Sequence, residues 1–138
     1  MKKRFFLAAA ALSLFFATSA SAQTDNWTKV EGCNVSVNEI QHDFGTKPLY
    51  TKTEFEFKIK NDSTEVLVIK NITTSCGCTT PTYSKRPVKE GKTAIVKVAY
   101  DSARIGAFDK TIYVYTNFST EPIELKIKGT MEEEKSNK

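Results

Sequence analysis

The chain is short of the residues from which enzyme active sites are usually built. It contains one histidine, three cysteines and one tryptophan among 138 residues. A single histidine leaves no Ser–His–Asp set beyond chance and no H-E-x-x-H metal motif, and the sequence has no glycine loop of the phosphate-binding kind. The sequence therefore predicts that the protein is not an enzyme.

Long apolar runs are missing beyond the first residues. Basic residues at positions 2–4 precede an apolar core at 5–16, and an Ala-Ser-Ala sequence ends at Ala22. This arrangement is typical of a secretory signal peptide over residues 1–22, cleaved after Ala22. Its core is shorter than the roughly 20 residues of a membrane-spanning helix. We therefore expect a protein of the periplasm or the cell exterior without a membrane span.

Excess charge of one sign is also scarce. The whole chain carries a formal charge of +4, and the three basic residues at positions 2–4 account for most of it. The remainder, residues 23–138, is left at about +1, which predicts no nucleic-acid-binding patch. Its last residues, 131–138, form a polar tail.

No segment shows a helical stripe, which excludes a parallel α/β fold. Apolar residues alternate instead with polar ones, as at Phe55, Phe57 and Ile59, and turn-forming residues separate the alternating segments. Strands are expected at 35–44, 53–60, 65–72, 78–83, 93–100, 108–116 and 122–129. About seven short antiparallel strands predict an all-β fold, a single Ig-like β-sandwich over residues 35–130.

Two details refine this prediction. Leu67 and Ile69 share one face of a strand, but Ile72 falls out of phase, which predicts a bulge near Lys70 and Asn71. The only tryptophan lies in the lead-in at residues 23–34. The Cys…Trp…Cys arrangement of antibody domains is therefore excluded, and the sandwich is of another kind.

Two motifs resemble a known family. "HDFGT" at 42–46 and "ITTSCGCTTP" at 72–81 are similar to an uncharacterised bacterial family of secreted Ig-like domains, domain-of-unknown-function family 1573. The resemblance covers roughly residues 37–130. It implies a seven-stranded, exported sandwich related to the major-sperm-protein-like and PapD-like group, whose members are generally protein-binding modules. It implies no established activity.

The cysteines allow three interpretations. The leading one is a disulfide from Cys33 to Cys76 or Cys78, which would close a loop of 43 or 45 residues and stabilise the fold by about 3 to 4 kcal/mol. A bridge between Cys76 and Cys78 would need a tight turn at Gly77 and would be reducible and redox-active. The third interpretation leaves all three thiols free.

The same residues also suggest a metal site. Residues two apart on a strand point to one side, so Cys76 and Cys78 could bind one soft ion, with copper(I) favoured over zinc. His42 is the only histidine that could add a third ligand. Apart from this copper alternative, no cofactor is expected.

Exposed aromatic residues indicate a partner surface. Tyr113 and Tyr115 alternate with apolar residues and should face away from the core, with Phe118 nearby. Aromatic residues are enriched at protein interfaces, and an edge strand could also accept a peptide strand. The expected partner is another envelope or extracellular protein.

Two serines are candidate modification sites. "DST" at 62–64 and "DSA" at 101–103 are similar to the acceptor pattern for O-glycosylation in exported proteins of some gut-type bacteria. Both triplets fall in expected turns, which makes Ser63 and Ser102 the candidate acceptors.

Together these observations predict an exported, non-enzymatic Ig-like interaction module whose partner the sequence does not name. The alternative is a small thiol-based copper-binding or redox protein that acts through Cys76 and Cys78.

Overall fold

The structure is a computed structural model that describes residues 26–135, so the predicted signal peptide at 1–22 lies outside the described residues. Within the described range the chain forms nine β-strands and no helix. The strands are β1 (Thr28–Val30), β2 (Val35–Val37), β3 (Gln41–Pro48), β4 (Glu54–Asn61), β5 (Ile69–Thr74), β6 (Thr79–Tyr83), β7 (Thr93–Tyr100), β8 (Gly106–Thr116) and β9 (Ile123–Glu132). Since this part of the chain has no helix, it has none that could cross a membrane.

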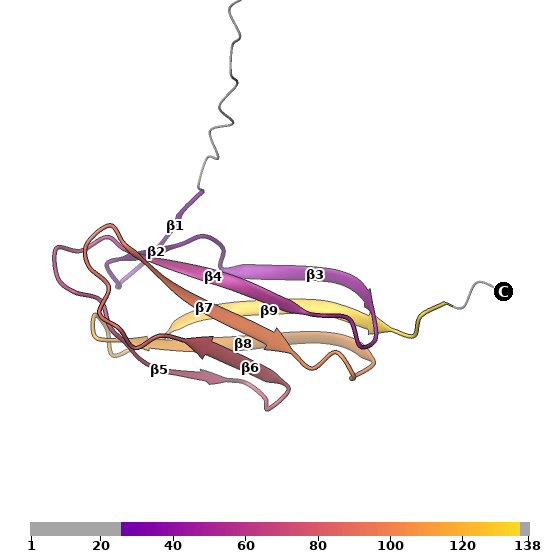
Figure 1. Ribbon diagram of the computed structural model, residues 1–138. Coiled ribbons are helices and arrows are strands. Elements are labelled where there is room, and N and C mark those ends of the chain that lie inside the picture. Colours follow the sequence, from indigo (N-terminus) through magenta and orange to yellow (C-terminus); the bar gives the residue numbers. More distant parts are fainter. Residues whose placement is uncertain (1–25, 136–138) are drawn as a thin grey trace, which may run out of the picture.

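The strands form two sheets packed face to face (Figure 1). One sheet has the order β1-β2-β4-β7-β6 and the other the order β3-β9-β8-β5. Every pair is antiparallel except β3 and β9, which run parallel. The predicted all-β sandwich is thereby confirmed.

The core lies between the inner faces of the two sheets, as the alternation predicts. In β4, Phe57 and Ile59 are fully buried, while Glu56 and Lys58 between and beside them are exposed. The same pattern places Ile112 and Val114 of β8 and the alternate residues of β9 inside. The hydrophobic effect on these apolar faces is what holds the two layers together.

The structure corrects the expected number of strands. The segment 35–44, expected as one strand, is divided between β2 in one sheet and β3 in the other. Where β2 leaves its sheet, the Asn38 side chain accepts a hydrogen bond from the Lys58 amide at 2.7 Å. This side chain takes over a place in the backbone ladder, which lets the chain cross between layers. Part of the expected lead-in also forms a strand, because β1 pairs with β2.

The bulge predicted near Lys70 and Asn71 is confirmed, because the register of β5 against β8 shifts between Ile69 and Asn71. This extra residue lets both Ile69 and Ile72 face the core.

A second bulge lies in β3, where the sequence suggested the end of a strand. The register against β9 shifts between Asp43 and Thr46, and Gly45 has φ 64°. The Gly45 amide donates to the Asp43 carboxylate at 2.8 Å, and this hydrogen bond lowers the pKa of Asp43 below its usual value. On the neighbouring strand, a Cβ at Gly129 would lie 3.0 Å from the Gly45 carbonyl and 2.9 Å from Phe108. Glycine at 129 is therefore required for the close approach of β3 and β9.

Candidate functional site

The two cysteines of the CGC sequence are bonded to each other at the turn between β5 and β6. Cys76 and Cys78 form a disulfide across Gly77, and their Cα atoms are 5.4 Å apart. Alternate residues of an extended strand would be about 6.6 Å apart, so the chain bends at this point. The turn joins an edge strand of the four-stranded sheet to an edge strand of the other sheet.

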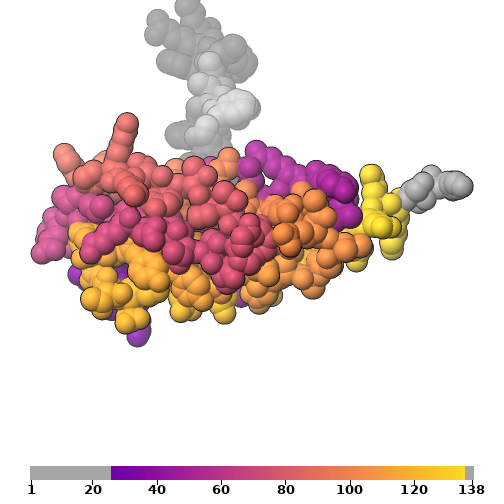
Figure 2. All heavy atoms as spheres, turned by 90° about the horizontal axis from the view of Figure 1, so that it is seen from below, coloured from indigo at the N-terminus to yellow at the C-terminus, as the bar shows by residue number. Residues whose placement is uncertain are grey.

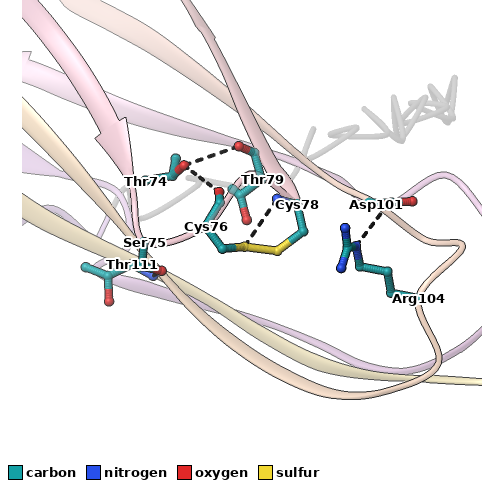
Figure 3. The surroundings of a disulfide bond; sticks show 8 residues. All are labelled: Thr74, Ser75, Cys76, Cys78, Thr79, Asp101, Arg104 and Thr111. Atoms are coloured by element: carbon teal, nitrogen blue, oxygen red, sulfur yellow. Dashed lines mark hydrogen bonds and ion pairs between the residues drawn. A yellow bond between two sulfur atoms is a disulfide. The ribbon is translucent and has the colours of Figure 1, made fainter.

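Hydrogen bonds fix the turn from within and from β8 (Figure 3). The Thr74 hydroxyl donates to the Cys76 carbonyl at 2.8 Å, and the Cys78 amide donates to the Cys76 Sγ at 3.2 Å. On the side of β8, the Ser75 amide donates to the Thr111 carbonyl at 2.9 Å, and the Thr111 amide donates to the Ser75 hydroxyl at 3.1 Å. These hydrogen bonds therefore hold the turn in place in addition to the disulfide.

The two sulfur-bearing residues differ in exposure. Cys78 is buried, with 8% of its surface exposed, whereas Cys76 is only partly buried and Gly77 is exposed. A Cβ added to Gly77 would have no atom of another residue within 4 Å. The turn is consequently open to solvent on the Gly77 side.

The loop between β7 and β8 lies against the Cys78 side of the turn. The Asp101 amide donates to the Cys78 carbonyl at 2.9 Å, and the Arg104 Nε donates to the Asp101 carboxylate at 3.1 Å. In Figure 3 the Arg104 guanidinium turns back toward the Cys78 side of the bridge. Viewed from below, the orange atoms of this loop adjoin the β5–β6 edge at the surface (Figure 2). The Asp101–Arg104 ion pair is thus joined to the CGC turn through the Asp101 backbone.

The same loop supports an exposed aromatic residue. The Tyr50 amide donates to the Ser102 carbonyl at 3.0 Å, and Tyr50 adopts φ 64° with 80% of its surface exposed. A bulky residue in the left-handed region is uncommon and costs conformational energy. Ile105 in the loop is 66% exposed as well. The end of the sandwich that carries the disulfide therefore also exposes two large side chains.

Tyr100, the last residue before this loop, has a different environment. Its ring stacks on Phe108 with centroids 3.8 Å apart. Burial raises the pKa of its phenol above the usual value.

A family model matches most of the chain. It describes a protein of unknown function, DUF1573, and it matches residues 35–131. The chain belongs to the DUF1573 family. No curated protein shows a significant match.

Solved structures share the fold of this DUF1573 protein at low identity. A protein of unknown function from Porphyromonas gingivalis matches with a TM-score of 0.61 and 17% identity, over 71% of this chain and 46% of its own. The PapD-like domain 7 of human CEP192 matches with a TM-score of 0.62 and 11% identity, over 83% of this chain and 96% of its own. The VesB protease of Vibrio cholerae matches with a TM-score of 0.56 and 17% identity, over 70% of this chain and 32% of its own. The chain thus spans less than half of the first and third proteins, and these likenesses show the sandwich fold alone.

The structure corrects the leading prediction for the cysteines. Cys33 is a free, buried thiol, with 7% of its surface exposed, and it forms no bridge to Cys76 or Cys78. It lies in the turn between β1 and β2, where the next residue, Asn34, accepts a hydrogen bond from the Asp62 amide at the end of β4. The CGC turn lies at the opposite end of the sandwich. Cys78 is hydrogen-bonded to Asp101, which follows the last residue of β7, whereas the end of β4 lies beside Thr93, the first residue of β7. Distance therefore prevents the predicted bridge.

The structure also separates His42 from the cysteines. His42 lies in β3, and strands β9 and β8 stand between β3 and β5, which corresponds to about 14 Å across the sheet. Its ring stacks on Phe55 with centroids 3.7 Å apart, so its place in the fold is explained by packing. Among residues 26–135 no group of three or more histidine, cysteine or acidic side chains is placed to hold a metal ion. His42 is therefore not a third ligand, and copper binding by Cys76 and Cys78 stays a prediction that first requires their reduction.

The residues of the predicted partner surface separate into two groups. Tyr113 and Tyr115 lie on the outer face of β8, half-buried, opposite Ile112 and Val114 in the core. Their predicted orientation is confirmed. Phe118, in contrast, packs partly against the hydrophobic core after the end of β8.

The two serines lie in loops at opposite ends of the sandwich. The Ser63 hydroxyl accepts a hydrogen bond from the Glu65 amide at 3.0 Å. Ser102 lies in the β7–β8 loop and is partly buried. Their glycosylation stays a prediction.

Sequence reasoning missed Asp101 and Arg104 as neighbours of the CGC turn. The segment "DSARIG" was interpretable only as a turn. The Asp-x-x-Arg spacing indicates a local ion pair, but nothing in the sequence states that this pair lies beside Cys78.

Proposed function

We propose that this DUF1573 protein is an exported, non-enzymatic Ig-like module that binds another envelope or extracellular protein. The observation that carries the proposal is the outer face of β8. Two tyrosines, Tyr113 and Tyr115, stand there two residues apart on an inner strand of the four-stranded sheet, and no other described element covers them. Export is inferred from the signal peptide predicted at 1–22.

The surroundings of the tyrosines suit a protein interface. Tyr113 is paired with Thr73 of β5 and Glu124 of β9, and Tyr115 is paired with Asn71 of β5. Tyrosine brings a large, rigid contact area with a polar end, and its few rotatable bonds make ordering inexpensive in entropy. A sheet face with two half-exposed tyrosines among polar side chains therefore fits a partner protein better than a small ligand.

Photo-crosslinking in the bacterium that makes the protein would test the proposal. A photoreactive amino acid at position 113 should give a discrete crosslinked species, and the same amino acid at position 58 should not. Lys58 is a matched control because it is exposed on the outer face of the opposite sheet. The crosslinked partner should then lose affinity for the variant Tyr113→Ser/Tyr115→Ser in a purified binding assay. Equal crosslinking from both positions, or an unchanged affinity, would contradict the proposal.

One observation favours a second candidate function, a thiol-based role. The bonded pair Cys76 and Cys78 lies in a turn that is open to solvent at Cys76 and Gly77, and it does not link distant parts of the chain. In the reduced form it would present two soft sulfur donors, which suit copper(I). Copper(I) titration should show binding by the reduced protein and none by the disulfide form. Binding that persists in the variant Cys76→Ser/Cys78→Ser would remove this candidate.

A further inference from the structure

We propose that the Cys76–Cys78 bridge is a thiol–disulfide exchange site for a dithiol partner protein. In this assignment Cys76 is the sulfur that the incoming thiolate attacks, and Cys78 is the sulfur that leaves. The inference does not depend on the tyrosine face, because it uses no property of Tyr113 or Tyr115.

A structural role explains this bridge poorly. The two cysteines are separated by a single residue, so the closed loop is very short and restricts the unfolded chain little. The turn is also fixed independently by hydrogen bonds from Thr74, Ser75 and Thr111. A staple that links two neighbours in an already fixed turn adds little to the fold.

Access selects Cys76 as the point of attack. Cys76 is only partly buried, whereas 8% of Cys78 is exposed. The neighbouring Gly77 is exposed and has open space where a side chain would stand. A thiolate from another protein can therefore approach Cys76, and the main chain of that protein can lie across Gly77 without a clash.

The groups around the bridge would stabilise a thiolate on Cys78 when the partner attacks, and a thiolate on Cys76 in the reverse reaction. Arg104 is paired with the Asp101 carboxylate, and the Asp101 amide donates to the Cys78 carbonyl. In Figure 3 the Arg104 guanidinium faces the Cys78 side of the turn, and we assign it the role of the neighbouring cation. A nearby cation stabilises a leaving thiolate. In the return direction, the Cys78 amide points at the Cys76 Sγ at 3.2 Å, where it would stabilise a thiolate on Cys76.

The exchange balances as follows. A thiolate of the partner forms a bond to the Cys76 Sγ, the Cys76–Cys78 bond breaks, and Cys78 leaves as a thiolate that takes up a proton. The second thiolate of the partner then attacks the partner's own sulfur in the mixed disulfide and releases Cys76 as a thiolate, which is also protonated. The partner dithiol is oxidised to a disulfide, and this protein is reduced to the dithiol by two electrons and two protons.

The first test measures reduction of the wild-type mature protein by dithiothreitol, a neutral dithiol. Timed alkylation and peptide mass mapping would follow each cysteine, with oxidised glutathione reduced in parallel as the reference disulfide. We expect the bridge to be reduced at a rate similar to that of oxidised glutathione, without denaturant. The buried Cys33 thiol should stay unmodified and serves as an internal check that the protein remains folded. Reduction only in denaturant, or only at the rate of unfolding, would overturn the proposal.

The second test assigns the two sulfurs. In the variants Cys78→Ser and Cys76→Ser, the remaining thiol is exposed to oxidised glutathione, and the mixed disulfide is measured by mass. We expect Cys76 to react about tenfold faster than Cys78, because it is the more accessible thiol and has the amide donor. Equal rates, or a faster Cys78, would overturn the assignment. If either variant fails to fold, acid-trapping the glutathione adduct during reduction of the wild-type protein by reduced glutathione gives the same assignment.

A matched pair of arginine variants tests the leaving group. Arg104→Gln should slow reduction by dithiothreitol several-fold, because Cys78 loses its neighbouring cation. Arg86→Gln should not, since Arg86 is exposed in the β6–β7 loop at the other end of the sandwich. Dithiothreitol attacks as a thiolate anion, so both variants are also compared at high salt, where attraction of the reagent is screened and a local effect on Cys78 remains. Equal rates in the two variants would overturn the role given to Arg104.

Discussion

The two ends of this sandwich use cysteine and polar groups in opposite ways. At the end with Cys33, the thiol is buried and unbonded, and the nearby Asn61 has no exposed surface. The Asn61 side chain donates to the carbonyls of Glu65 and Val88 at 2.7 and 2.8 Å and accepts from the Ser63 amide at 2.9 Å. Every polar group of that side chain is therefore paired.

The end with the CGC turn is built differently. Its cysteines are oxidised, its turn is open to solvent, and the hydroxyl of the buried Thr79 has no hydrogen-bond partner within the described part of the chain. Tyr50 and Ile105 expose large apolar side chains in the neighbouring loops. The difference indicates that one end contributes stability, whereas the other keeps reactive and apolar groups accessible at little cost to the fold.

The largest expected effect is at the Cys33 end. Asn61→Ala removes a fully buried amide that satisfies three backbone groups, and should lower the free energy of unfolding by about 3 kcal/mol. Urea unfolding would measure it. Asn34→Ala at the same end is the control, because Asn34 is exposed and its side chain makes no hydrogen bond in the described structure, so little change is expected. Similar losses in both variants would break the comparison between the ends.

Substitutions of two glycines compare a closely packed part of the backbone with the open CGC turn. Gly129→Ala places a methyl group against Phe108 and the Gly45 carbonyl, and should destabilise by about 2 kcal/mol. Gly77→Ala meets open space at a φ outside the left-handed region, and should change stability by less than about 0.5 kcal/mol. Thermal or urea unfolding of both variants would show the contrast. A large loss at Gly77 would mean that the CGC turn is a structural element after all.

Reduction of the bridge should have a smaller effect than loss of the Asn61 contacts. Because the bridge closes a loop of only three residues, the dithiol form should be less stable by about 1 to 2 kcal/mol. Urea unfolding with and without reductant would measure this difference, with Cys76→Ser/Cys78→Ser as the control that reductant should not affect. A loss above about 4 kcal/mol would be more than twice what this entropy model gives for a loop of three residues and would identify the bridge as a staple.

The smallest effect is expected at Thr79. Thr79→Val replaces an unpaired buried hydroxyl with a methyl group of similar size, so stability should be unchanged or higher by up to about 1 kcal/mol. The matched control is Thr74→Val, which removes the hydroxyl that donates to the Cys76 carbonyl and should therefore destabilise the turn. If Thr79→Val is clearly the more destabilising of the two, the Thr79 hydroxyl has a hydrogen-bond partner, and the two ends do not differ in how fully their polar groups are paired.

Local sequence patterns predicted where the strands lie but not which strands pair with each other. The alternation at Phe55, Phe57 and Ile59 identified β4 because burial of one sheet face imposes a period of two on any strand. The phase slip before Ile72 identified the β5 bulge for the same reason. The division of 35–44 into β2 and β3 was not predicted. The apolar residues slip in phase between Val37 and Ile40, but such a slip also fits a bulge within one strand, and only the tertiary structure shows that the chain crosses between sheets there.

The candidate site was predicted in part. The CGC sequence itself drew attention to Cys76 and Cys78, and the outward direction of Tyr113 followed from alternation within β8. The disulfide predicted for Cys33 was wrong. The number of residues between two cysteines indicates how much a bridge would stabilise the chain, but it does not show that Cys33 and the CGC turn lie at opposite ends of the sandwich. His42 failed as a ligand for the same reason, since it lies at the opposite edge of its sheet.

The sequence alone determined the all-β fold, the buried face of each strand and the residue types available for chemistry. These properties depend on neighbours within a few positions along the chain, where side-chain direction is fixed by backbone geometry. Only the tertiary structure decided that Cys76 pairs with Cys78, that Cys33 is alone at the other end, and that Asp101, the partner of Arg104, is bonded to the CGC turn. Those relations depend on which strands lie side by side and on the loops that meet at each end, and no local pattern encodes distances between such segments.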